Sequence, residues 1–262
     1  MTAPVHFAHG NGFPGGSYRQ LLSHLEPYYD CIFMDKIGHR NDYPVTDNWP
    51  YLVDELIAHI KEKANQPVVA VGHSLGGGLS LMAAIKEPRL FKAVVMLDAP
   101  MMSRLKSFSI YLAKCLNFID SVTPAKLAKK RKDYWPNFAD LRPYFQAKSL
   151  FKDFEPACLD DYINSGFEKE NNGYTLRFKK EIEYAIFRSL PHNCYRFEKK
   201  LLVKAALIYG ENSHVLNKWD RYYMQKYFAI NSSKIKGGHM FPMEYPKLAA
   251  QEIRRVLSTI LL

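Results

Sequence analysis

Ser74 is the residue of this 262-residue sequence best suited to act as a nucleophile. It lies in GHSLGG (residues 72–77), directly after the apolar run VVAV (residues 68–71) and at the start of a helical pattern. The spacing G-x-S-x-G is typical of a sharp turn between a strand and a helix, which lifts a serine hydroxyl above a sheet. The first N–H groups of a helix have no partner and favour negative charge, so the pattern predicts a nucleophilic serine.

The glycine-rich loop HGNGF (residues 9–13) is a second candidate functional element. Attack of a hydroxyl on a carbonyl places negative charge on the carbonyl oxygen, and backbone N–H groups aimed at that oxygen stabilise it. We expect Asn11 to supply one such N–H and Leu75, directly after the serine, to supply the other. An ordinary glycine turn is the alternative, and a phosphate-binding P-loop is disfavoured because no lysine follows at its position.

His239 is the candidate general base, which a serine hydroxyl requires near neutral pH. The stretch KGGHM (residues 236–240) follows the last expected strand and opens onto the same sheet edge as the serine. A histidine in an ordinary polar turn is the alternative. Among the other histidines, His73 lies inside the serine turn and points away from its neighbour, whereas His9 and His39 are expected to brace loops.

Short apolar runs alternate with helical patterns along most of the chain. The expected strands lie at residues 5–8, 31–35, 68–71, 93–97, 205–210 and 234–236, and the main helices at residues 17–25, 49–64, 219–228 and 246–261. Such alternation predicts a parallel sheet whose right-handed crossovers place helices on both faces. The expected fold class is α/β, a three-layer sandwich of about six mostly parallel strands that binds ligands at their carboxyl ends.

The alternation is interrupted in residues 101–204. This segment is predicted to be mainly helical, with helices at residues 109–119, 124–132, 156–165 and 179–189. We expect it to form a helical lid over the carboxyl edge of the sheet, inserted into a core made of residues 1–100 and 205–262.

Most of the net charge of +10 lies in the same segment. Residues 101–204 contain 20 Lys and Arg against 12 Asp and Glu, a difference of +8, and 18 of the 36 aromatic residues. The densest basic cluster is KLAKKRK (residues 126–132). Such a cluster suits nucleic acid, an anionic membrane surface or an acidic substrate, or is simply the solvated face of a helix. Because no recognition motif accompanies it, we expect no specific nucleic-acid partner.

Composition argues against several other classes. No apolar run reaches 18 residues, so no transmembrane segment is expected. The opening residues MTAP lack the basic and apolar regions of a signal peptide. Cys31, Cys115, Cys158 and Cys194 are scattered without C-x-x-C spacing, which favours free thiols in a reducing cytoplasm over disulfides or a metal site.

Taken together, these motifs resemble those of serine hydrolases with the α/β-hydrolase fold. HGNGF is similar to the oxyanion loop of that family, GHSLGG to its nucleophile elbow, and GGHMFPMEYP (residues 237–246) to the histidine turn before its last helix. The resemblance implies that Ser74 is the nucleophile and His239 the general base. It also implies that the N–H groups of Asn11 and Leu75 form the oxyanion hole, and that the reaction needs no metal or organic cofactor.

The acid of the expected triad departs from the commonest pattern of the family. The family usually places it in the turn after the strand that follows the lid, where this chain has Ser213 in GENS (residues 210–213). Some relatives carry the acid one strand earlier, a position that Asp98 matches, and Ser213 is then implied to assist the histidine. We therefore expect Asp98 to orient His239. Glu211 is the reserve acid, and a capping or lid-anchoring role is the alternative for Asp98.

The resemblance implies a carboxylesterase-like enzyme that cleaves carboxylic esters of short to medium acyl chains, or thioesters, through an acyl-enzyme. A cofactor-free hydrolase of carbon–carbon bonds uses the same set of residues, and a binding protein without turnover would keep the same pocket, so both stay as alternatives. The lid aromatics favour an apolar acyl or aryl pocket, and its charge favours an anionic substrate group such as the phosphates of an acyl-coenzyme A. The sequence leaves the oligomeric state open.

Overall fold

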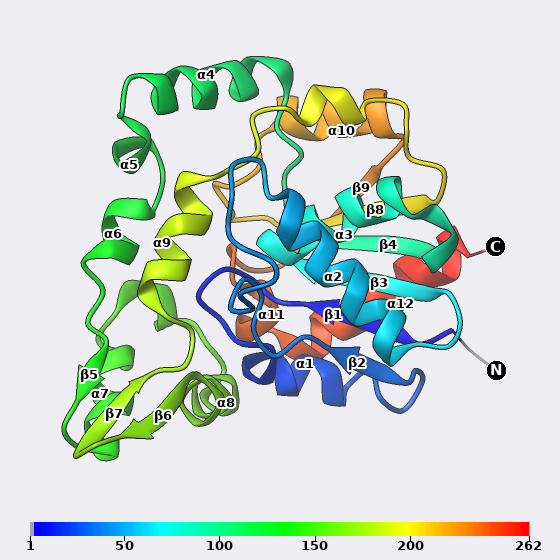
Figure 1. Cartoon of the computed structure of the whole chain (residues 1–262). Coiled ribbons are helices and arrows are strands. Elements are labelled where there is room, and N and C mark those ends of the chain that lie inside the picture. The colour runs from blue at the N-terminus through cyan, green and yellow to red at the C-terminus, as the bar shows by residue number, and fades with distance from the viewer. Residues whose placement is uncertain (1–2, 262) are drawn as a thin grey trace.

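The computed structural model describes residues 3–261, and a six-stranded sheet forms its centre (Figure 1). The strand order is β2-β1-β3-β4-β8-β9, and each neighbouring pair is parallel. The strands are β1 Val5–Ala8, β2 Cys31–Phe33, β3 Val68–His73, β4 Phe91–Leu97, β8 Lys204–Gly210 and β9 Asn231–Ile235. The prediction of an α/β fold with about six mostly parallel strands is confirmed.

Helices cover both faces of this sheet and complete the three layers. One face carries α1 (Arg19–Ser23), α11 (Phe241–Glu244) and α12 (Pro246–Ile260), and the other carries α2 (Pro50–Lys63), α3 (Leu75–Lys86) and α10 (Lys218–Phe228). Within β3, Val69 and Val71 join the first hydrophobic cluster, whereas Val68 and Ala70 join the second. The division follows from the strand geometry, because successive side chains point to opposite faces.

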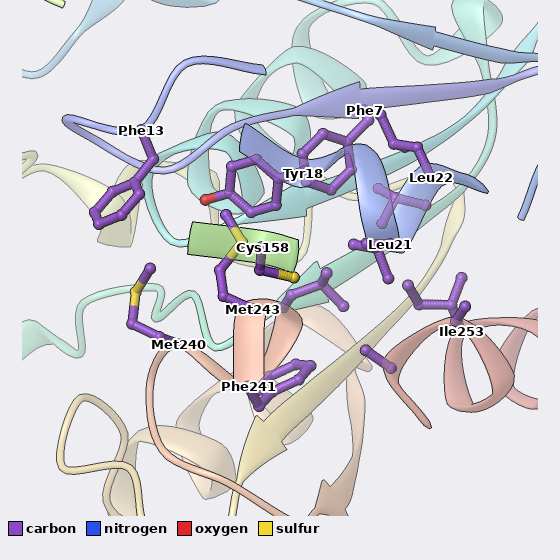
Figure 2. Close-up of a cluster of buried hydrophobic side chains, with 14 of the residues drawn as sticks. Phe7, Phe13, Tyr18, Leu21, Leu22, Cys158, Met240, Phe241, Met243 and Ile253 are labelled. Atoms are coloured by element: carbon purple, nitrogen blue, oxygen red, sulfur yellow. The ribbon is translucent and has the colours of Figure 1, made fainter. Parts of the chain in front are cut away.

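Figure 2 shows how α1 and α12 close the first face. Phe7 of β1, Leu21 and Leu22 of α1, and Ile253 of α12 gather in one cluster of buried side chains. Burial of one such side chain contributes about 1.5–3 kcal/mol. This packing holds β1, and therefore the glycine-rich loop that follows it, in a set position.

Residues 101–204 enter between β4 and β8, and we call them the inserted segment. Its helices are α4 Arg104–Cys115, α5 Ile119–Val122, α6 Ala125–Lys129, α7 Leu141–Gln146, α8 Pro156–Gly166 and α9 Lys180–Arg188. Its strands are β5 Tyr134–Trp135, β6 Phe167–Glu170 and β7 Gly173–Leu176. No helix within residues 3–261 combines the length and the apolar composition needed to cross a bilayer.

The inserted segment differs from the sequence-based expectation in several places, among them the helix α7, which was not expected. The helix expected at residues 109–119 begins earlier, at Arg104, and ends at Cys115, shortly before Asn117 adopts a positive φ of 54°. A three-stranded antiparallel sheet, β5-β7-β6, was not expected from the sequence. Its β6–β7 hairpin turns at Asn171, whose φ is 51°, and asparagine tolerates this conformation better than most residues.

Aromatic side chains join the inserted segment to the sheet. Trp135, Phe145 and Tyr162 belong to the same hydrophobic cluster as Val69 of β3. The Tyr162 ring also lies 5.2 Å, between ring centroids, from Phe13 after β1. The segment thus shares a core with the sheet, while its role as a separate lid over residues 1–100 and 205–262 stays a prediction.

Candidate active site

Ser74 lies at the turn between β3 and α3, at an edge where the sheet register brings two candidate residues together. His73, the last residue of β3, pairs with Leu97, the last residue of β4. Ser74 and Asp98 therefore leave neighbouring parallel strands at the same edge. The N–H of Ser74 donates a 2.9 Å hydrogen bond to the carbonyl of Leu97, which ties this turn to β4.

Ser74 and Asp98 both have backbone conformations that are rare outside glycine. Ser74 has φ 51° and ψ −113°, and Asp98 has φ 46°. Such conformations cost about 1–3 kcal/mol each and persist only where the surroundings enforce them. The structure therefore contains the sharp strand-to-helix turn expected from the G-x-S-x-G spacing.

Two glycines make this turn sterically possible. A Cβ at Gly76 would lie 2.0 Å from the carbonyl oxygen of Ala8 in β1, and a Cβ at Gly72 would lie 2.4 Å from the carbonyl carbon of Gly76. Both distances are far shorter than van der Waals contact. Only glycine at these positions lets α3 start this close to β1 and β3.

Asp98, His239 and Ser213 meet beside the serine turn. Oδ2 of Asp98 lies 2.7 Å from Nδ1 of His239 and accepts a 2.5 Å hydrogen bond from Oγ of Ser213. Its other oxygen, Oδ1, accepts a 3.1 Å bond from the N–H of Gly210. Because a buried carboxylate can only accept at these atoms, Nδ1 of His239 carries a proton and donates a hydrogen bond to Asp98.

Glu211, the reserve acid, lies away from this group. Its carboxylate is 3.7 Å from the ammonium of Lys234, and its N–H donates to the carbonyl of Ile235. Both contacts turn Glu211 toward β9. Of the two carboxylates considered, only Asp98 hydrogen-bonds to His239 within residues 3–261.

The glycine-rich loop lies against the serine turn. The N–H of Gly76 donates a 3.1 Å hydrogen bond to the carbonyl of His9, so loop and turn share a contact. The N–H groups of Asn11 and Leu75 donate to no other group among residues 3–261. The two donors named from the sequence are therefore both free to bind an acceptor.

A chain of hydrogen bonds that the sequence did not reveal links this loop to the histidine turn. The N–H of Gly10 donates to the Tyr18 hydroxyl over 3.1 Å, and that hydroxyl lies 2.7 Å from Nδ1 of His73. Nε2 of His73 lies 2.9 Å from the carbonyl of His239 and must donate to it. Nδ1 then accepts from Tyr18, so His73 is neutral with its proton on Nε2.

Electrostatics agree with this assignment for His73. Its ring is almost fully buried, and burial, reinforced by the neighbouring His239, lowers its pKa well below the usual range. Because His73 is neutral, the chain of hydrogen bonds from Gly10 through Tyr18 and His73 to His239, which we call the relay, stays intact at neutral pH. His73 thus acts as a spacer between the loop and the histidine turn.

Glu244 of α11 supports the same turn from the other side. Its Oε2 accepts a 2.8 Å hydrogen bond from the N–H of Gly238, next to His239. Gly237 has φ 115°, and a Cβ there would lie 2.6 Å from Oε2 of Glu244. Burial raises the pKa of this carboxyl. The only signal in the sequence was a glutamate five residues after the histidine, which is too common a spacing to be diagnostic.

His9 and His39 hold loops together, as the sequence suggested. Nε2 of His9 accepts a 2.9 Å bond from the N–H of Ile37, and Nε2 of His39 accepts a 3.0 Å bond from the N–H of Lys179. Burial lowers the pKa of each ring to about 4. Both rings are therefore neutral at pH 7 and able to accept.

The inserted segment covers the glycine-rich loop with a charged pair. Arg131 binds the carboxylate of Glu183 in α9 and the hydroxyl of Tyr162. The Asn11 side chain donates a 3.0 Å hydrogen bond to the carbonyl of Glu183. A Cβ at Gly12, whose φ is 80°, would lie 2.9 Å from the Glu183 carboxyl carbon, so glycine allows this close contact.

The remaining relationship is between Ser74 and His239. Among residues 3–261, no hydrogen bond joins the Ser74 hydroxyl to the His239 imidazole. The rings of His73 and His239 lie 4.8 Å apart, between centroids, which brings the His239 ring to the residue directly before Ser74. Serine–histidine bonds in such sites often form fully only with substrate bound.

Comparisons with known proteins agree with this architecture. A family model described as "Alpha/beta hydrolase family" matches residues 7–252. The chain is 26% identical over 250 residues to the uncharacterized hydrolase YugF of Bacillus subtilis, a match covering 90% of this chain and 83% of that protein. The solved structure of E-2-(acetamidomethylene)succinate hydrolase superposes with a TM-score of 0.78 at 17% identity, over 98% of this chain and 91% of the other.

A further relative matches only part of the chain. Monoglyceride lipase from Rattus norvegicus is 28% identical over 128 residues, which is 45% of this chain and 42% of the lipase. The match thus spans less than half of either protein.

Proposed function

Because the chain belongs to the alpha/beta hydrolase family, we propose that it is a serine hydrolase of carboxylic esters. In this proposal Ser74 is the nucleophile, His239 the general base and Asp98 the acid that orients the base. The observation that carries it is the 2.7 Å contact between Asp98 and His239, made at the sheet edge where Ser74 occupies a strained turn. The partial similarity to a monoglyceride lipase favours an ester substrate.

The proposed reaction uses the proton arrangement described above. The Ser74 hydroxyl attacks the ester carbonyl and passes its proton to Nε2 of His239, forming a tetrahedral oxyanion. The oxyanion accepts hydrogen bonds from the N–H groups of Asn11 and Leu75, each of which contributes about 3–4 kcal/mol to such a transition state. The intermediate collapses to an acyl-enzyme as the alcohol leaves with the proton from His239.

Hydrolysis of the acyl-enzyme repeats these steps with water. His239 takes a proton from the water molecule, whose oxygen attacks the acyl carbonyl, and the proton then returns to the Ser74 oxygen. The products are a carboxylic acid and an alcohol. Asp98 keeps the imidazole in the tautomer that accepts at Nε2 and stabilises the imidazolium formed in each half-reaction.

Three features support Asp98 over Glu211 as the acid. Asp98 is fully buried, and both of its oxygens have hydrogen-bond partners in addition to His239. The Glu211 carboxylate instead forms an ion pair with Lys234. Ser213 hydrogen-bonds to Asp98 and so would assist His239 through the carboxylate, not by direct contact.

The substrates we propose are small-molecule esters with short to medium acyl chains, with thioesters as the second possibility. The inserted segment would act as the lid, because its α9 contacts the oxyanion loop through Glu183. Its aromatic side chains favour an apolar acyl group, since transfer of apolar surface from water is the main source of affinity for such a group.

Steady-state hydrolysis of p-nitrophenyl acetate, butyrate and octanoate tests this proposal. We expect turnover by the wild type, its loss in Ser74→Ala, and a fall in kcat of about 10⁴-fold in Asp98→Asn. Glu211→Gln is the matched control and should keep nearly full activity. A single acylation without turnover would favour a binding protein, and an inactive Glu211→Gln with an active Asp98→Asn would move the acid to Glu211.

A further inference from the structure

Helix α4 of the inserted segment turns its apolar face to solvent. Leu105, Phe108 and Leu112 are 75%, 57% and 40% exposed, and Leu116, the residue that caps the helix, is 74% exposed. The spacings of three, four and four residues place all four side chains along one stripe of the helix. We call these four residues the α4 stripe.

The opposite face of α4 is polar and lies against the rest of the protein. The ammonium of Lys106 binds the buried carboxylate of Asp220 over 2.6 Å. Lys114 binds Asp47 and donates a 2.6 Å bond to the carbonyl of Leu190. A surface helix normally buries its apolar stripe and exposes its charges, so the orientation of α4 is the reverse of the usual one.

The exposed apolar surface continues along the chain into α5 and α6. Phe118, Val122 and Leu127 are each more than half exposed. In Figure 1 these three helices run one after another along the outer margin of the inserted segment, away from the central sheet. Single exposed apolar residues are ordinary, but a helix stripe followed by three further ones indicates an interaction surface.

The charges near this surface are almost all positive. Residues 104–130 contain six Lys and Arg and one acidic residue, Asp120, which is bound by the Tyr184 hydroxyl and by Arg188. On α6 and at its end, Lys126, Lys129 and Lys130 are exposed, and none of them pairs with a carboxylate among residues 3–261. The run of helices from α4 to α6 thus carries both exposed apolar side chains and unneutralised lysines.

We propose that this surface binds the protein to an anionic lipid bilayer. The α4 stripe would enter the boundary between headgroups and acyl chains, and the α6 lysines would contact the phosphates. Helices that lie in a membrane interface combine an apolar face with nearby basic residues in this way. The proposal rests on surface residues alone and does not depend on the proposed ester hydrolysis.

Charge complementarity favours an anionic bilayer over other partners. A second copy of the chain would bring like-charged lysines together, and the net charge of +10 adds to the repulsion. A nucleic acid would attract the lysines but would offer nothing to cover leucine side chains. An anionic bilayer satisfies both features of the surface.

Sedimentation of the full chain with lipid vesicles tests the proposal. We expect binding to vesicles of phosphatidylcholine with about 30% phosphatidylglycerol to be at least about tenfold stronger than to phosphatidylcholine alone. The triple variant Leu105→Gln/Leu112→Gln/Leu116→Gln should weaken binding about tenfold or more. Leu202→Gln is the matched control, because Leu202 is 79% exposed but lies outside this surface.

A second pair of variants tests the charges separately. Lys126→Glu/Lys130→Glu should reduce binding to the anionic vesicles, and Lys247→Glu, an exposed lysine on α12, should not. Circular dichroism of every variant checks that it is folded. Wild-type binding by both the triple and the double lysine variants, or no vesicle binding by the wild type, would overturn the proposal.

Two further outcomes would also overturn it. If sedimentation velocity shows a wild-type dimer that the triple variant disperses, and vesicles are not bound, the surface is an interface between copies. If the wild type binds a labelled oligonucleotide but not vesicles, and only the lysine variant weakens that binding, the surface is a nucleic-acid site.

Discussion

Ser213 donates a 2.5 Å hydrogen bond to Oδ2 of Asp98, the same oxygen that lies 2.7 Å from the ring of His239. Together with the N–H of Gly210 on Oδ1, this gives the carboxylate three partners in a fully buried setting. Hydrogen bonds to an ionised group stabilise the charged form. Asp98 is therefore held in position, and we propose that Ser213 is a positioning residue whose contribution can be measured.

Ser213→Ala should reduce kcat by at most about 10- to 150-fold, because a single hydrogen bond to a charged group contributes about 1.5–3 kcal/mol. The loss should be smaller than that of Asp98→Asn, since the N–H of Gly210 still holds the carboxylate. The measurement is kcat and KM for p-nitrophenyl butyrate across the pH range. We expect KM to stay constant and the acidic limb of the kcat profile to shift. A loss as large as that of Asp98→Asn would instead make Ser213 indispensable.

Tyr18→Phe should break the relay between the glycine-rich loop and the histidine turn. Removing the hydroxyl leaves the Gly10 N–H and Nδ1 of His73 without partners in a buried setting. Each unsatisfied group costs about 1–3 kcal/mol, so the free energy of unfolding should fall by at least that amount. Urea denaturation measures the loss, and kcat should also fall because the loop carries Asn11.

Tyr51→Phe is the control for this change, since Tyr51 is 45% exposed. Its stability and kcat should match the wild type. Wild-type values for Tyr18→Phe would show that the relay contributes nothing.

Gly76→Ala and Gly78→Ala should have opposite effects although both glycines lie in α3. A Cβ at Gly76 would lie 2.0 Å from the Ala8 carbonyl oxygen, so we expect a loss of about 3 kcal/mol or more. At Gly78 the nearest atom is a ring carbon of Trp49 at 3.8 Å, and alanine should stabilise the helix by about 1 kcal/mol. Thermal unfolding of both variants checks the pair, and equal effects would contradict the steric argument.

Glu55→Gln should make stability less dependent on pH. Burial raises the pKa of Glu55 to about 7, although Oε2 accepts a 2.7 Å bond from the N–H of Gly38. Between pH 4.5 and 7 the folded protein keeps a proton that the unfolded chain has released, so stability falls as pH rises through this window. The loss reaches up to about 3 kcal/mol above pH 7.

The variant lacks this titration, so its stability relative to the wild type should improve from pH 5 to pH 8. Urea denaturation at both pH values measures the difference, with Glu26→Gln, an exposed glutamate, as the control. If the free energies of unfolding of Glu55→Gln and the wild type differ by the same amount at pH 5 and at pH 8, Glu55 ionises normally.

The sequence by itself determined the parallel α/β sheet, the serine turn and the edge at which His239 lies. These features depend on residues that are close together in the chain. The periodicity of apolar residues in strands and helices is a local property, and so is the spacing from Gly72 to Gly76. The order of strands then assigns loops to one edge without any knowledge of side-chain contacts.

Only the tertiary structure decided between Asp98 and Glu211 as the partner of His239. It also revealed the link through Tyr18 and His73. These contacts join residues 141 and 55 positions apart, and their geometry depends on sheet register and packing that no local pattern encodes. Helix α4 is a second example. The spacing of its apolar residues predicts a helix but does not show which face is buried. Ion pairs with the distant carboxylates of Asp47 and Asp220 turn its lysines inward and leave its leucines in solvent.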